Sequence, residues 1–148
     1  METPAKKEHI KMVATAHLIL KKWNEILFLQ RANTGYADGM YSVVAGHADG
    51  NESVKEAMMR EAREEAGIVV KLEDLRFVLV LHRLDDREQI DFFFEAKEWE
   101  GEIINREPHK CSDLSWFPLD NLPANTIPYI AQAIESYRNG TNYLEMGF

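Results

Sequence analysis

Residues 46–68 read GHADGNESVKEAMMREAREEAGI, and this stretch decides the fold. It begins as a loop rich in glycine and aspartate and continues as a helix crowded with glutamates. Ser53 is a good N-cap residue, and Glu56, three residues later, completes a capping box. Gly67 supplies the left-handed residue with which helices commonly end. The stretch therefore predicts a helix between Ser53 and Gly67.

A helical wheel places glutamates of this helix on the side that should pack. That side holds Val54, Ala57, Met58, Glu61, Glu64 and Glu65. The opposite side holds Glu56, Met59, Arg63 and Ala66. Carboxylates clustered near a core are costly unless positive charge compensates them, and Arg60, spaced for a pair with Glu64, cannot balance three acids. A hard divalent cation, Mg²⁺ or Mn²⁺, would do so, and a solvated acidic helix with salt bridges is the alternative.

The spacing of the charged residues matches a known motif. Gly46, five residues, Glu52, seven residues and then Arg60 to Ile68 fit G-x5-E-x7-R-E-U-x-E-E-x-G-U, where U is a bulky aliphatic residue. Every charged and glycine position is met, and Ala62 is small for its aliphatic position. The sequence therefore resembles the Nudix hydrolase family, and the resemblance extends over most of the chain.

Length and composition set the broad class. The chain has 148 residues, is 45% hydrophobic and 28% charged, and carries a net charge of −8. These values predict a single soluble domain over residues 1–148, with residues 1–8 flexible, and argue against binding to a nucleic acid polymer or an anionic membrane. A polyphosphate would need a bridging metal to approach so acidic a protein. Cys111 is the only cysteine, and no signal peptide or membrane span is visible, so we expect a cytoplasmic protein.

The rest of the chain alternates strands and turns, mostly as hairpins. We expect strands at His9–Leu20, Glu25–Gln30, Tyr41–Ala45, Leu75–Leu84, Gln89–Ala96 and Leu114–Leu119, an extended segment at Val69–Leu72 and a last helix at Ile127–Tyr137. This order predicts an α+β fold with a mixed sheet. The resemblance sharpens it to the Nudix α/β/α sandwich, with helices packed on both sides of the sheet.

The resemblance also implies a metal site and its supporting residues. Its expected ligands are Glu61, Glu64, Glu65, the backbone carbonyl of Ala45, and Glu107 from a later loop, with Glu102 as the rival to Glu107. Catalytic roles fall to Glu64, Glu61 and Arg60, and the choice of general base is open. Arg60 and Glu52 are expected to orient the ligands. Gly46 lets the loop approach closely.

Substrate contacts follow from the same resemblance and from side-chain chemistry. Arg31 and Lys110 are candidates for phosphate, since a guanidinium matches phosphate geometry well. Asn125 could read a purine edge, and its alternative role, shared with Thr126, is to cap the last helix. Tyr36 could stack on a base, as could Tyr41 and Phe93 if they do not simply pack in the protein. His47 could touch phosphate or lie exposed in its loop.

These features predict a Mg²⁺-dependent pyrophosphohydrolase, with Mn²⁺ as the alternative cation. Its substrate would be a nucleoside triphosphate, as in MutT-like enzymes that act on oxidised purines, and its products a nucleoside monophosphate and pyrophosphate. One alternative is a nucleoside diphosphate linked to a sugar, ribose or second nucleoside, although residues 83–86 carry neither marker of those subfamilies. A non-catalytic nucleotide-binding module is the other. Members of the family are often dimers, so the resemblance implies a homodimer as one expected assembly.

Overall fold

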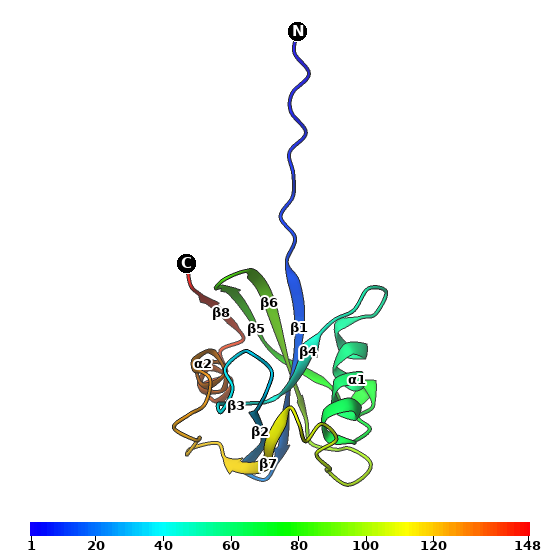
Figure 1. Cartoon of the computed structure of the whole chain (residues 1–148), viewed down its shortest axis with the longest axis vertical. Coiled ribbons are helices and arrows are strands. Elements are labelled where there is room, and N and C mark those ends of the chain that lie inside the picture. The colour runs from blue at the N-terminus through cyan, green and yellow to red at the C-terminus, as the bar shows by residue number, and fades with distance from the viewer.

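The computed structural model describes residues 1–148 and shows a mixed β-sheet between two helices (Figure 1). The strand order is β3-β2-β1-β6-β5-β8, with β4 paired to β1 and β7 paired to β2. The elements are β1 (Val13–Lys22), β2 (Glu25–Arg31), β3 (Tyr41–Ser42), β4 (Val44–His47), α1 (Val54–Ala66), a 3₁₀ turn (Leu72–Asp74), β5 (Arg76–Leu84), β6 (Glu88–Ala96), β7 (Cys111–Pro118), α2 (Pro128–Arg138) and β8 (Tyr143–Met146). The expected α+β fold is confirmed.

Strand β1 lies at the centre of the sheet and is buried on both faces. It pairs in parallel with β6 and antiparallel with β4, and its last two residues pair with β2. Successive side chains of a strand point to opposite faces. Leu18 and Leu20 accordingly join the core beneath α1, whereas Ile19 joins the core beneath α2. The two helices therefore cover opposite faces of the sheet, as the α/β/α expectation requires.

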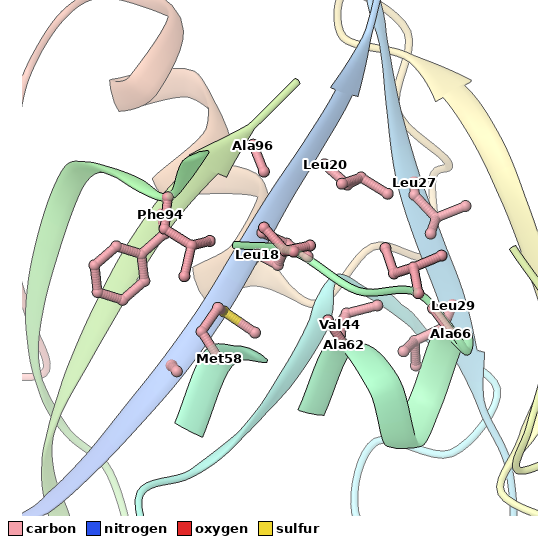
Figure 2. Packing of buried hydrophobic residues seen from close by; sticks show 14 of the residues in the cluster. Leu18, Leu20, Leu27, Leu29, Val44, Met58, Ala62, Ala66, Phe94 and Ala96 are labelled. Atoms are coloured by element: carbon pink, nitrogen blue, oxygen red, sulfur yellow. The ribbon is translucent and has the colours of Figure 1, made fainter. Parts of the chain in front are cut away.

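Helix α1 packs through a stripe of apolar residues one turn apart. Met58, Ala62 and Ala66 are fully buried and face the strand residues Leu18, Leu29 and Val44 (Figure 2). The wheel expectation that placed Ala66 away from the core is therefore wrong. The stripe is centred near Ala62, where a small side chain lets the helix approach the sheet closely. The glutamates consequently lie along the edge of the packing face, with Glu61 and Glu65 half-buried and Glu64 exposed.

The two ends of α1 follow the sequence expectation. The Ser53 side chain accepts a hydrogen bond of 3.1 Å from the Glu56 backbone N–H. Gly67 adopts φ 69°, and its N–H donates to the carbonyls of Ala62 and Arg63. These caps satisfy backbone groups that would otherwise lack partners. The start and the end of the helix are thus determined locally.

Several boundaries differ from those predicted. The first strand begins at Val13 rather than His9, and the Tyr41–Ala45 segment is split at Val43, where the chain leaves β2 to pair with β1. The 69–72 segment makes one bridge, between Val69 and Glu100, before the 3₁₀ turn. The N-cap position of α2 is Ile127, which makes no side-chain capping bond, and not Asn125 or Thr126. These boundaries depend on which strands pair with each other, and the hydrophobic pattern of a sequence does not show strand pairing.

The C-terminal strand β8 was not predicted from the sequence. It pairs in parallel with β5, from Val80 opposite Tyr143 to Arg83 opposite Met146. At the other end, residues 1–12 form no helix or strand and extend away from the sheet (Figure 1). Neither helix is long and apolar enough to cross a membrane.

We predict that Gly67→Ala destabilises the protein by about 1 kcal/mol, because a side chain disfavours positive φ. The added Cβ would also lie 3.0 Å from the Arg106 side chain. Gly50→Ala is the matched control, since a Cβ there meets nothing within 4 Å. Chemical denaturation measures both variants, and equal stabilities for the two would contradict the assigned cap.

Candidate active site

A cavity of about 370 Å³, here called the acid cavity, opens beside the C-terminal half of α1. Its lining residues are Ala45, Gly46, His47, Asp49, Glu61, Glu64, Glu65, Glu107 and Lys110. The structure thus brings together the five residues that the sequence nominated as metal ligands. Glu102, the rival to Glu107, does not line this cavity.

The loop that carries Glu107 is tied to the end of α1. The backbone N–H groups of Ile104 and Arg106 donate to the carbonyls of Ala66 and Glu65, at 2.9 and 3.3 Å. Such bonds satisfy carbonyls that a helix end leaves free. They also place Glu107 next to the glutamates of the helix, although some forty residues separate them in sequence.

Burial and mutual repulsion raise the proton affinity of the acids. The pKa of Glu65 lies well above its usual value, first because the group is buried and then because Glu61 and Glu107 repel its charge. A hydrogen bond from the Ala45 backbone opposes this shift only in part. Burial also raises the pKa of Glu61, against the effect of Arg60. Two carboxylates held side by side and partly removed from water favour sharing a proton or a cation over both being free anions.

The donor set fits a hard divalent cation. Carboxylate oxygens are the ligands that Mg²⁺ and Mn²⁺ prefer, and Glu61, Glu64, Glu65 and Glu107 line the cavity against one lysine, Lys110. Ala45 and Glu65 line the same cavity, so the strand backbone lies beside these acids. The carboxyl groups surround the cavity without forming a closed set of three ligands. A cation held here would therefore draw them inward.

Gly46 has a steric role in this cavity. A Cβ atom built on Gly46 would overlap the carboxyl group of Glu61. Only glycine lets strand β4 approach the helix so closely. Gly46, the first glycine of the motif, thus lies directly against Glu61. The sequence predicted such a close approach at this glycine.

Arg60 links the motif's loop to its helix. It donates to Glu52 through Nε and Nη2 at 3.1 and 2.8 Å, and to Glu61 at 2.8 Å. It also reaches Glu64 at 3.3 Å and the His47 carbonyl at 3.0 Å. The bonds from Arg60 lower the pKa of Glu52 to about 2. Arg60 thus contacts both Glu52 and Glu61, and the role of Arg60 and Glu52 in orienting a metal ligand stays a prediction.

A second cavity of about 370 Å³, here called the polar cavity, adjoins the first and shares Ala45, Gly46 and His47 with it. Its further lining residues are Thr15, His17, Arg31, Tyr36, Ser42, Arg83, Asp85, Asp86, Arg87, Gln89 and Tyr129. The predicted substrate residues Arg31 and Tyr36 both belong to it. Arg31 donates to the Tyr36 carbonyl at 2.8 Å, and its guanidinium lies 5.3 Å from the centre of the Tyr36 ring.

Of the other substrate candidates, Lys110 lines a cavity, whereas Asn125, Tyr41 and Phe93 do not. Lys110 lines the acid cavity and also a neighbouring cavity of about 330 Å³ that contains Arg31. Asn125 lies outside these cavities, and its amide donates to the Gly39 carbonyl at 2.8 Å. The Tyr41 hydroxyl donates to Asp113, and Phe93 is fully buried. Tyr41 and Phe93 thus follow the packing alternative.

His47 is exposed and lies between the acid cavity and the polar cavity. Its Nε2 is 2.8 Å from a guanidinium nitrogen of Arg87. Partial burial, and then the charge of Arg87, lower the pKa of His47. A neutral imidazole is therefore favoured there, and it accepts the hydrogen bond from Arg87.

Sequence reasoning missed a buried polar network on the floor of the polar cavity. Arg83 donates to Asp91 at 2.9 Å, Gln89 donates to the other Asp91 oxygen at 2.7 Å, and the guanidinium of Arg83 lies 3.7 Å from the centre of the Tyr129 ring. His17 completes the floor from β1. The available signal was the presence of polar residues inside otherwise apolar strands, such as Asp91 in QIDFFF.

Comparison with known proteins identifies the family. The model of the NUDIX domain family matches residues 10–137, which include both cavities' motif residues and most of the sheet. The chain therefore belongs to the Nudix hydrolase family.

The proteins similar to this chain are named for several different activities. It is 29% identical over 117 residues to an NAD-capped RNA hydrolase NudC of Stutzerimonas stutzeri, covering 79% of this chain and 41% of that protein. It is 31% identical to an 8-oxo-dGTP diphosphatase of Proteus vulgaris, covering 69% and 87%. It is also 31% identical to an ADP-ribose pyrophosphatase of Methanocaldococcus jannaschii, covering 71% and 61%. The chain spans about two fifths of the length of that NudC protein.

Solved structures show the same fold. A MutT NUDIX hydrolase from Burkholderia pseudomallei superposes with a TM-score of 0.78 at 24% identity, covering 85% of this chain and 98% of that one. A NUDIX hydrolase from Nitrosomonas europaea gives 0.75 at 19% identity, covering 95% and 81%. Identities this low establish the architecture and leave the substrate to the site itself.

The burial of His17 predicts a pH-dependent stability. Burial lowers the pKa of His17 from 6.5 to about 4 in the folded protein. Between these values the unfolded chain takes up a proton that the folded protein does not, so stability falls as the pH drops from 6.5 to 4. The shift corresponds to roughly 3 kcal/mol.

Urea unfolding of the wild type and of His17→Gln across this pH range measures the effect. We expect the variant to lose this part of the slope, whereas His9→Gln, in the exposed N-terminal segment, keeps it. Parallel pH profiles for the wild type and His17→Gln would show that His17 is not the group that titrates.

Proposed function

We propose that this Nudix hydrolase cleaves a nucleoside triphosphate to a nucleoside monophosphate and pyrophosphate, with Mg²⁺ as its cofactor and Mn²⁺ as a substitute. The observation that carries the proposal is the junction of two cavities. One is lined by four glutamates suited to a divalent cation, and the other is lined by Arg31, Arg83 and Arg87. A polyphosphate needs both, because the protein as a whole carries a charge of −8.

We assign the following roles in the reaction to the residues of the two cavities. Glu61, Glu64, Glu65 and Glu107 would hold the cation, with the Ala45 carbonyl as a further ligand. When bound, such a cation neutralises phosphate oxygens and acidifies water. Arg60, fixed by Glu52, positions Glu61. One of the cavity's glutamates accepts the proton of the attacking water, and Arg31 and Lys110 donate to phosphate oxygens.

The substrate's base is less strongly supported than its phosphates. Asn125 was the sequence argument for a purine, and its amide is bonded to Gly39 away from the cavities. The cavities support a polyphosphate, and the likeness to the Proteus vulgaris diphosphatase, most of whose length this chain covers, favours a triphosphate over a diphosphate derivative.

A second candidate substrate is a nucleoside diphosphate linked to a sugar or a second nucleoside. The NudC protein and the ADP-ribose pyrophosphatase among the similar proteins favour it. The polar cavity favours it as well, because hydroxyl, amide and guanidinium groups suit a polyhydroxyl group.

Product analysis with a panel of nucleoside triphosphates, ADP-ribose, NAD and dinucleoside polyphosphates, in Mg²⁺, distinguishes the two. The proposal predicts nucleoside monophosphate and pyrophosphate from at least one triphosphate. We further predict that Glu64→Gln and Glu65→Gln each lower kcat by about 100-fold or more, because a carboxylate ligand or base is lost. Glu56→Gln, on the exposed side of α1, should leave kcat unchanged.

Two results would count against the proposal. Cleavage of diphosphate derivatives alone would select the second candidate. Turnover that survives both glutamine substitutions would show that the acid cavity is not the reaction centre.

A further inference from the structure

Two buried polar atoms on strand β1 have no hydrogen-bond partner in the protein. They are Thr15 Oγ1 and His17 Nδ1. Their residues are 6% and 1% exposed, and both line the polar cavity. Buried polar groups are almost always paired, because an unpaired one costs stability. An unpaired group in a ligand cavity therefore indicates a partner that the ligand supplies.

The surrounding polar groups are already paired, which makes these two atoms exceptional. Asp91 lies opposite Thr15 in the sheet and accepts hydrogen bonds from both Arg83 and Gln89. His17 stacks on Phe93, with ring centres 4.5 Å apart, and its Nε2 lies 3.4 Å from the Tyr129 hydroxyl. The His17 ring is thus fixed in place. Rotation about χ1 between staggered positions lets the Thr15 hydroxyl turn toward a ligand.

The polar cavity lies between two cavities of different character. On one side it shares residues with the acid cavity. On the other side it shares Tyr36, Arg83, Asp85 and Tyr129 with a further cavity of about 270 Å³, here called the apolar cavity. The further lining residues of the apolar cavity are Leu84, Ile127, Pro128, Met146 and Gly147. Strand β8, which begins beyond the residues that the family model matches, contributes Met146 to this wall.

The order of the cavities matches the order of groups in a nucleotide. Phosphates belong at the acid cavity and its junction with the polar cavity. A flat base belongs between Tyr36 and the apolar residues, and the pentose belongs in the part of the polar cavity between them. We infer that the Thr15 hydroxyl, beside the fixed ring of His17, binds a pentose hydroxyl, so that the enzyme selects nucleotides by their sugar. This inference rests on the proposed function, because it assumes a nucleotide whose phosphates occupy the acid cavity.

Hydroxyl recognition has a measurable consequence. A site built to bind a substrate hydroxyl rejects the analogue that lacks it, because the protein's own polar groups then stay unpaired. We expect wild-type kcat/KM for a ribonucleoside triphosphate to exceed that of its 2′-deoxy or 3′-deoxy analogue by about tenfold or more. A MutT-like preference for deoxynucleotides would be the opposite outcome.

Thr15→Val, Thr15→Ser and Thr141→Val test the role of the hydroxyl. The valine variant should bring kcat/KM for the ribonucleotide down to that of the deoxy analogue, and the serine variant should keep the preference. Thr141 is exposed and lines none of the three cavities, so its change should have no effect. The melting temperature of Thr15→Val should equal or exceed the wild-type value, because the lost hydroxyl has no partner in the free protein.

Thermal shifts with the four ribonucleoside monophosphates and their 2′-deoxy and 3′-deoxy counterparts give a readout that needs no turnover. A larger shift with the ribonucleotide, lost in Thr15→Val, supports the inference even if no triphosphate is hydrolysed, in which case only the proposed function fails. Equal shifts, or a hydroxyl preference that Thr15→Val leaves intact, overturn the inference even if hydrolysis is observed.

Discussion

The close approach of α1 to β4 is the constraint on which the rest of the site depends. Met58, Ala62 and Ala66 anchor the helix to the sheet, so the helix cannot rotate to turn its glutamates into solvent. Gly46 then brings the strand against Glu61, and burial raises the pKa of both Glu61 and Glu65. The fold thus holds several carboxylates together at a cost in repulsion that a bound cation relieves.

The sheet extends the site beyond this helix. Strand β1 lines the polar cavity on one face and the core beneath α1 on the other, so one strand contributes to both. The buried pair of Arg83 and Asp91 fixes a guanidinium in the cavity wall, and Tyr129 of α2 covers it. The two helices therefore have separate roles in the site. Helix α1 bears the acids, and α2 closes the side where the substrate's remaining groups would lie.

The sequence predicted what local patterns determine. The motif, the caps at Ser53 and Gly67 and the two hairpins depend on residues close together in the chain, and all of these appear in the structure. It did not predict what depends on distant pairing: strand β8, the buried side of Ala66, and the network around Asp91. Asn125 illustrates the limit. Its neighbours in sequence suggested a base contact, but its partner is Gly39, brought near by the pairing of the chain around Tyr41.

Mn²⁺ binding to the free protein, followed by electron paramagnetic resonance, tests the central claim most directly. The account predicts that Glu65→Gln and Glu107→Gln each weaken binding by about tenfold or more, since each removes a carboxylate ligand from the acid cavity. Glu56→Gln and Glu102→Gln, which change glutamates outside that cavity, should bind Mn²⁺ as the wild type does. Unchanged binding in Glu65→Gln and Glu107→Gln, or equal weakening in all four variants, would contradict the account.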